Sequence, residues 1–153
     1  MNTIFLALTF AFIQTAGLTQ TNNQIADIDK KVKEIKDNIN NYKTEAFKYA
    51  DSTLKTTYSD KKVVKMIILS YKDNHLDKRT EIFFSNGQMI FHEQIWTDSK
   101  GQIVNDEKSY LADHRLIKWI KTDNKEVDKN SDDFKWWNKK LSESSKSWKK
   151  DTK

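Results

Sequence analysis

The middle of the chain repeats one pattern about every thirteen residues, in which a polar turn is followed by an apolar position. The copies begin at residues 59, 72, 85, 98 and 112, and a weaker copy begins at residue 122. One strand plus one tight turn fits this spacing, so the chain is expected to fold back on itself as an antiparallel meander. The pattern predicts an architecture and carries no chemistry of its own.

Six strands are expected from this pattern, at residues 52–58, 63–71, 79–85, 88–96, 102–111 and 115–121. The strongest hairpin signal is Asn86-Gly87, because both residues tolerate the backbone angles of a tight turn. The segment 63–71 is almost entirely apolar, which is typical of a strand that is covered on both faces. With three glycines and no proline in the chain, Asn and Asp are expected to occupy the left-handed turn positions.

An amphipathic helix is predicted before the strands. Its apolar residues recur in steps of three and four, at Ile25, Ile28, Val32, Ile35, Ile39 and Tyr42. Asparagines at positions 38, 40 and 41 weaken the helix, so its end is expected near Asn41. The same spacing permits a coiled-coil dimer, but it spans fewer than four heptads, and packing on the chain's own sheet is the favoured interpretation.

A second helix is predicted at the C-terminal end. Ser131 is a suitable N-cap, and acidic residues follow it in the first turn. One face of this helix carries Phe134, Trp137, Leu141 and Trp148, which are expected to dock it onto the sheet. Its lysines also permit weak contact with a membrane surface. They are Lys139, Lys140, Lys146, Lys149, Lys150 and Lys153.

The first residues have the pattern of an export signal, predicted over residues 1–18. An apolar run from Ile4 to Ile13 precedes small residues, and cleavage is expected between Ala16 and Gln20. The alternative is a buried N-terminal element. Ten apolar residues are too few for a permanent membrane span, which needs about 20. The chain has no cysteine, so a lipoprotein anchor and disulfides are not expected.

These features together predict an exported protein, periplasmic or extracellular, with a single α+β domain over residues 19–153. The net charge of +5 attracts anionic surfaces only diffusely. Arg79 and Arg115 are the only arginines. Because arginine is the usual residue for bidentate recognition of bases and phosphates, a specific nucleic-acid partner is not expected.

Catalytic and metal-binding patterns are sparse. His75 and His114 fall in turns at opposite ends of the predicted sheet, and His92 lies in mid-strand without an identifiable partner. No metal site or cofactor is therefore predicted. Glu81, Glu93 and Glu107 lie on neighbouring strands and could form the carboxylate pair of a hydrolase. The favoured alternative is that lysines on adjacent strands, at positions 65, 108 and 118, neutralise them.

The predicted binding surface consists of His92, Trp96, Tyr110 and Trp119, which lie on three neighbouring strands. Strict alternation along residues 88–96 puts Ile90, His92, Gln94 and Trp96 on one face. If both helices cover the same face of the sheet, the other face keeps exposed aromatic rings, and such patches mark binding sites. The alternative is that curvature of the sheet or the C-terminal helix covers both faces, in which case these residues belong to the core.

The hairpin repeat resembles that of MORN-variant proteins, including the YwqK-like antitoxin group, over residues 58–121. The best matches are Phe84-Ser85-Asn86-Gly87-Gln88-Met89 and the degenerate Leu111-Ala112-Asp113-His114-Arg115-Leu116. The arrangement of signal, helix, hairpins and tryptophan-bearing tail also resembles small exported proteins of Bacteroidota. These resemblances imply a binding role without catalytic residues.

Three functional hypotheses follow. The leading one is an exported, non-enzymatic binding protein whose ligand is a protein, a glycan or a lipid. The first alternative is an immunity or inhibitor protein that binds a toxin or an enzyme. The second alternative is a carboxylate-based hydrolase.

Overall fold

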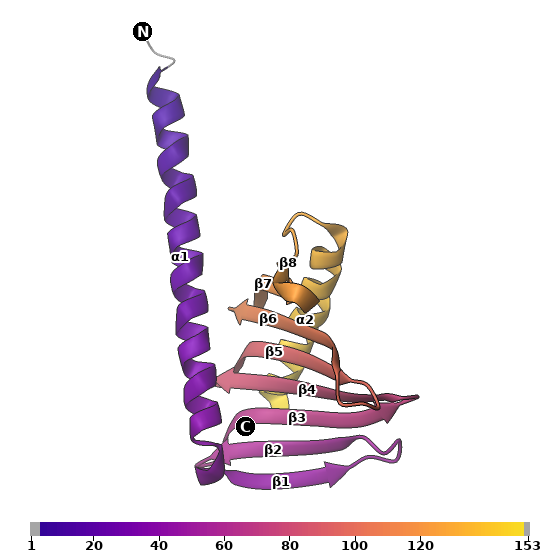
Figure 1. The fold of residues 1–153 in the computed structure, drawn as a ribbon. Helices are drawn as coiled ribbons and strands as arrows, with labels where there is room; N and C mark the ends of the chain where they lie inside the picture. The colour runs from indigo at the N-terminus through magenta and orange to yellow at the C-terminus, as the bar shows by residue number, and fades with distance from the viewer. Residues whose placement is uncertain (1–3, 152–153) are drawn as a thin grey trace.

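The computed structural model describes the backbone of residues 4–151 and the side chains of residues 20–148. It shows one open antiparallel sheet of eight strands that are hydrogen-bonded in chain order, with two long helices packed against it (Figure 1). The predicted α+β meander with a helix toward each end of the chain is confirmed. The sheet has two more strands than the six that the sequence pattern predicted.

The elements follow one another without a crossover. They are α1 (Ile4–Asp37), the 3-10 helix η1 (Ile39–Asn41), β1 (Lys43–Lys48), β2 (Leu54–Asp60), β3 (Val63–Asp73), β4 (Leu76–Ser85), β5 (Gln88–Thr97), β6 (Ile103–Ala112), β7 (Arg115–Lys121), the 3-10 helix η2 (Thr122–Asn124), β8 (Lys125–Glu126) and α2 (Asp132–Asp151).

The two additional strands are the edges of the sheet. β1 pairs with β2 from Lys43 opposite Ser59 to Lys48 opposite Leu54, and the two-residue β8 pairs with β7. All six residues of β1 are exposed, and its sequence lacks the alternation that marks a half-buried strand. The hydrophobic pattern therefore carried no signal for β1, which forms by backbone pairing alone.

The tight turns use left-handed residues that are mostly not glycine. Positive φ angles occur at Asn74, Asn86 and Asp113, as expected in a chain with three glycines. Lys61, Lys62 and His114 also adopt positive φ angles, although their side chains make this conformation less favourable. The strand pairing on each side of these turns compensates for that cost.

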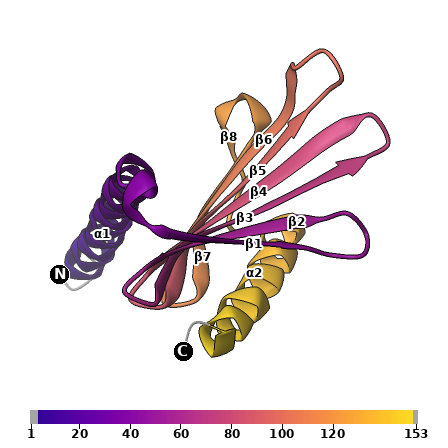
Figure 2. The ribbon, with the colours of Figure 1, turned by 90° about the horizontal axis from the view of Figure 1, so that it is seen from below.

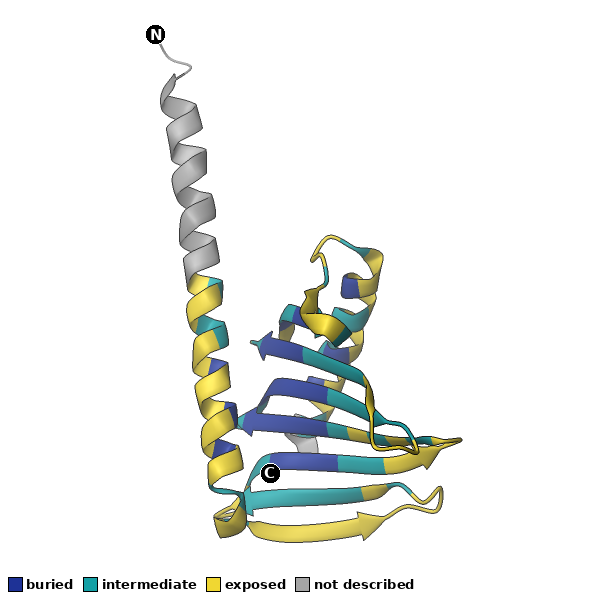
Figure 3. Cartoon of the chain, in the orientation of Figure 1, coloured by how far each residue is buried: buried dark blue, intermediate teal, exposed yellow. Residues whose placement is uncertain are grey.

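The two helices lie on opposite faces of the sheet (Figure 2). On one face, α1 contributes Ile28, Val32 and Ile35 to a core cluster that also contains Met66, Ile68, Phe83, Ile90, Phe91 and Tyr110. On the other face, α2 contributes Phe134 and Leu141 to a cluster with Ile67, Ile82, Phe84, Met89, Leu111, Leu116 and Trp119. Both faces are therefore covered, each in part, and the buried residues concentrate in β3–β6 (Figure 3).

The pairing of β4 with β5 contains a register shift between Phe83 and Phe84. The side chains of β5 therefore do not alternate between the two faces as predicted. Ile90 and Phe91 both belong to the cluster under α1, whereas Met89 belongs to the cluster under α2. The expectation that Ile90 shares a face with His92 is therefore wrong. The bulge places one additional apolar side chain under α1, and such local irregularities are not visible in a binary pattern.

Helix α1 is continuous from Ile4 to Asp37, so its end lies a turn earlier than expected and η1 follows it. The predicted export signal over residues 1–18 lies outside the residues whose side chains the structure describes, as do Lys149, Lys150 and Lys153 of the tail. Among the described residues, neither helix has a segment that is both long and apolar enough to cross a membrane.

Helix α2 docks through the predicted residues. The Ser131 hydroxyl accepts a hydrogen bond of 3.2 Å from the backbone N–H of Phe134, which confirms the N-cap. The Asn138 side chain accepts the backbone N–H of Leu116 at 2.8 Å, and His114 shares a 2.8 Å hydrogen bond with the buried Ser145. Polar and apolar contacts thus fix α2 across the hairpin of β6 and β7.

Candidate functional site

The structure does not bring the four predicted binding residues together on one exposed surface. His92, Tyr110 and Trp119 are only 6–7% exposed, and Trp96 is half-buried. Tyr110 belongs to the cluster under α1, whereas Trp119 belongs to the cluster under α2. Tyr110 and Trp119 are core residues on opposite faces of the sheet, so the predicted surface divides between the two layers.

Tyr110 is held under α1. Its ring packs edge-to-face on Phe91 with 4.9 Å between ring centroids. Burial raises the pKa of the Tyr110 phenol, and the nearby Asp29 carboxylate of α1 raises it further. The neutral phenol therefore serves the contact between α1 and the sheet.

Two of the three predicted carboxylates meet under α1. Glu81 of β4 lies directly opposite Glu93 of β5, and Lys36 Nζ lies 3.2 Å from Glu81 Oε2 and 3.3 Å from Glu93 Oε2. Arg79 reaches Glu81 at 2.7 Å, and Lys108 reaches Glu93 at 3.8 Å. Burial lowers the pKa of Lys36, but the two carboxylates outweigh burial and raise it above its usual value.

Glu107, the third carboxylate, lies on the other face. Its Oε2 accepts a 3.1 Å hydrogen bond from the indole N–H of Trp119. Glu107 therefore does not join Glu81 and Glu93. Lys108 pairs with Glu93, as the sequence suggested. Nothing in the local sequence indicated that Lys36 and Arg79 would pair with these carboxylates.

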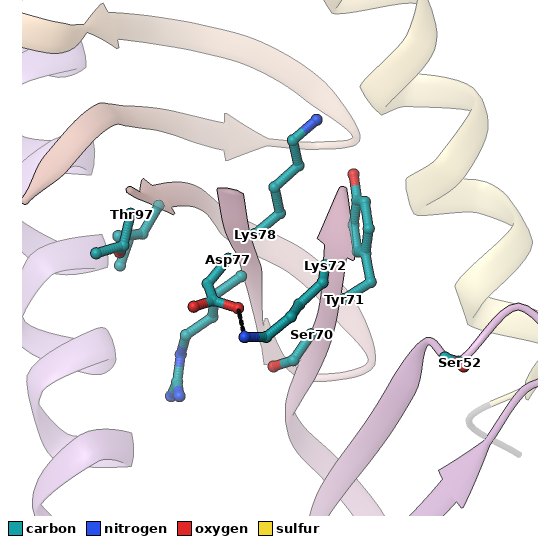
Figure 4. Close-up of a pocket in the computed structure, with 9 residues that line it drawn as sticks. Ser52, Ser70, Tyr71, Lys72, Asp77, Lys78 and Thr97 are labelled. Carbon is teal, nitrogen blue, oxygen red and sulfur yellow. Dashed lines mark ion pairs between the residues drawn. The ribbon is translucent and has the colours of Figure 1, made fainter. Parts of the chain in front are cut away.

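One hollow of about 550 Å³ lies at the end of the sheet where the β1–β2 and β3–β4 turns are found. Figure 4 shows Lys72 and Asp77 joined across it, at 3.2 Å, while Tyr71 and Lys78 point away from that pair. Lys78 Nζ lies 4.6 Å from the ring centroid of Trp96, and an ion pair joins Lys78 to Asp73. The charged side chains here are therefore partnered within the chain itself.

A second hollow, of about 370 Å³, lies where α2 begins, over β5–β7. We call it the tryptophan cleft. It is lined by Gln94, Glu107, Trp119, Lys121, Asp133, Trp136 and Trp137. Three of the five tryptophans of the chain therefore converge in one place. The cleft combines apolar rings with a few polar groups, as small-ligand sites commonly do.

The three rings contact one another in series, and we call this stack the platform. Trp136 and Trp137 are stacked at 18°, with 5.8 Å between ring centroids. Trp137 and Trp119 are tilted by 37° at 5.9 Å. Trp119 is buried and Trp137 is half-buried, whereas Trp136 is 59% exposed. The platform thus runs from the core out to the solvent.

Hydrogen bonds fix the inner part of the platform. The indole N–H of Trp137 donates to Ser109 Oγ at 3.0 Å, and that of Trp119 donates to Glu107. By contrast, the side chains of Gln94 and Trp136 make no hydrogen bond within the described part of the chain. An amide and an indole N–H therefore remain available at the cleft for a ligand.

The start of α2 explains why adjacent tryptophans divide between core and solvent. Phe134 and Leu141 face the sheet, and Trp137 follows Phe134 by three residues on the same helical face. Trp136 is rotated by one position and projects outward. Lys140 Nζ, one turn later, lies 5.9 Å from the Trp136 ring centroid, and Lys121 Nζ lies 4.6 Å from that of Trp119.

A neighbouring hollow of about 380 Å³ lies between α2 and strands β3–β5, and it shares Gln94 and Trp137 with the cleft. His92 lines it and packs edge-to-face on Trp137 at 5.6 Å. Burial lowers the pKa of His92 to about 4. His92 therefore supports the inner wall of the platform as a neutral ring.

The sequence identified Trp119 at this site and missed the other lining residues. The pair Trp136-Trp137 in the first turns of the last helix could have indicated that one of these rings is exposed, because only one of two adjacent helical residues can face the sheet. Gln94, Lys121 and Asp133 carried no local signal. Within the described residues, no three His, Asp or Glu side chains converge in a way that could hold a metal ion.

Comparisons with protein-family models, with curated proteins and with solved structures found no match for this chain.

Proposed function

We propose that this chain is an exported, non-enzymatic binding protein and that the tryptophan cleft is its ligand site. The observation that carries the proposal is the exposed ring of Trp136, stacked on Trp137 beside the Gln94 amide, which makes no hydrogen bond to the described residues. Trp136 and the half-buried Trp137 form contiguous apolar surface beside a hollow, and contiguous apolar surface marks interaction sites.

The pairing of the carboxylates supports binding rather than hydrolysis. Glu81 and Glu93 are buried and joined to Lys36, and Glu107 accepts the Trp119 indole N–H. A carboxylate-based glycosidase needs one carboxylic acid and one carboxylate that flank an accessible substrate. The contacts of these three residues serve packing in the two core layers instead.

The test uses two variants that are matched in exposure. Trp136 and Phe47 are both 59% exposed, so neither substitution to Ala removes a core residue. The purified chain and both variants are immobilised and exposed to protein, glycan and lipid fractions of the source organism's envelope. Retention of a component by the original chain and by Phe47→Ala, with loss in Trp136→Ala, is the expected result. Equal retention by Trp136→Ala contradicts the proposal.

The second candidate function is an immunity or inhibitor role toward a protein partner, and the open edge of β1 supports it. The strand is exposed along its whole length, and Phe47 and Tyr49 form an exposed edge-to-face pair at 4.8 Å. An unprotected edge can pair with a strand of another protein. In the same experiment, loss of a retained protein in Phe47→Ala alone favours this candidate over the cleft.

A further inference from the structure

We infer that the tryptophan cleft recognises the sugar ring of a neutral glycan. The inference rests on the proposed function and names the class of ligand for the same site. It follows from the geometry of the rings, from the polar groups around them and from the local balance of charge.

The rings form a platform and not a cage. A cage for a cation needs aromatic faces on opposite sides of it, each within about 6 Å of the charge. Trp136 and Trp137 lie nearly parallel with 5.8 Å between centroids, and Trp137 and Trp119 are in a similar contact, so no cation fits between them. Trp136, at the outer end of the stack, is 59% exposed, and a flat aromatic ring that is open to solvent suits the apolar C–H face of a sugar ring.

The groups beside the platform suit hydroxyl ligands. Gln94 offers an amide that both donates and accepts hydrogen bonds and that has no partner among residues 20–148. Glu107 uses only Oε2 for Trp119, and Asp133 uses only Oδ2, 3.4 Å from Lys121 Nζ. One oxygen of each carboxylate therefore remains to accept a hydroxyl proton. Acceptors at the rim of an aromatic surface match the hydroxyl groups at the edge of a sugar.

The charges at the cleft balance. Glu107 and Asp133 oppose Lys121, which lies over Trp119, and Lys140, which lies near Trp136. The whole chain carries +5 and attracts anions diffusely, but this site offers an anion no net positive charge. A neutral ligand is therefore favoured over a phosphate, a nucleic acid or an anionic lipid headgroup. The hollow of about 370 Å³ falls in the usual size range of small-ligand sites.

Lys140 lies near the exposed ring of Trp136. Its Nζ is 5.9 Å from the Trp136 centroid, near the limit of a cation–π contact. Because the Lys140 side chain is exposed and flexible, a ligand can displace it. Displacement leaves the ammonium at the rim, where it can donate to a hydroxyl.

The test is calorimetric titration of the full chain with four neutral tetrasaccharides, cellotetraose, chitotetraose, mannotetraose and maltotetraose. Tryptophan fluorescence is recorded in parallel. Binding of at least one tetrasaccharide is expected. Trp136→Ala should weaken it by about tenfold or more, as removal of a stacking ring does. Trp136→Tyr should keep most of the affinity because it keeps a flat ring. Ile103→Ala, at a side chain that is 62% exposed and lies outside the cleft, should leave the affinity unchanged.

The remaining outcomes distinguish failure of the glycan inference from failure of the proposed binding function. If a proline-rich peptide or phosphatidylglycerol vesicles bind in a Trp136-dependent manner and no tetrasaccharide binds, the glycan inference is overturned and the proposed function stands. If a tetrasaccharide binds equally to Trp136→Ala, both the inference and the site are overturned. Asp133→Ala, which removes both acceptor oxygens at an exposed side chain, gives a second test should Trp136→Ala fail to fold. Unchanged affinity in this variant overturns the role given to the Asp133 carboxylate.

Discussion

The imidazole of His92 is buried on the α2 side of β5, against Trp137. Burial lowers its pKa to about 4 from the ordinary value of 6.5. The unfolded chain therefore binds a proton at a higher pH than the folded chain does. The contribution of neutral His92 to stability is complete above about pH 6.5 and falls as the pH decreases toward 4, by up to about 3 kcal/mol.

The measurement is the free energy of urea unfolding between pH 7 and pH 4. His92→Phe keeps an aromatic ring beside Trp137 and removes the titrating group, so its stability should depend less on pH over this window. His75→Gln is the control, because it replaces an exposed histidine of the β3–β4 turn that belongs to neither core cluster. Parallel pH curves for the original chain and His92→Phe would refute this account.

At the scale of elements, Lys36 is the polar link between α1 and the sheet. It contacts Glu81 and Glu93, whose side chains are only 7% and 9% exposed, while its own side chain is 46% exposed. Removal of one partner of a buried ion pair costs about 3–5 kcal/mol, and the exposure of Lys36 reduces this through solvent screening. We expect Lys36→Met to destabilise the fold by about 2 kcal/mol in urea unfolding.

Lys33 provides the matched control one turn earlier on α1. It pairs with Asp37, and both side chains are exposed, so Lys33→Met should change stability by less than about 0.5 kcal/mol. Adding Glu93→Gln to Lys36→Met should restore part of the lost stability, because it removes an uncompensated buried charge. An equal effect of Lys33→Met and Lys36→Met would show that the link to the carboxylates is not stabilising.

The elements that could be predicted from sequence are those with a periodic signal. The hairpin from Glu81 to Met89 and the N-cap at Ser131 follow from local chemistry and are present. β1 escaped prediction because every one of its residues is exposed. The faces were mispredicted at Ile90 because a bulge breaks the alternation. Of the tryptophan cleft only Trp119 was predicted, since its neighbours come from four elements that tertiary packing alone brings together.

At the scale of the whole molecule, the sheet separates two hydrophobic cores and contributes side chains to both. Different aromatic residues lie in each core. The five tryptophans lie on the α2 side, whereas Tyr42, Tyr58 and Tyr110 lie on the α1 side. Phe83 and Phe84 are adjacent in β4 and are both fully buried, one in each cluster. Neither layer can separate without disturbing the strands that complete the other.

Cooperative unfolding is the expected consequence. Tryptophan fluorescence, which reports on the α2 layer, and far-ultraviolet circular dichroism, which reports on the sheet, should give the same urea midpoint. Phe83→Ala should lower that fluorescence midpoint about as much as Phe84→Ala, each at a cost of about 3–5 kcal/mol, although no tryptophan lies on the Phe83 side. If Phe83→Ala shifts only the dichroism, the α1 layer unfolds independently and the two cores are not coupled through the sheet.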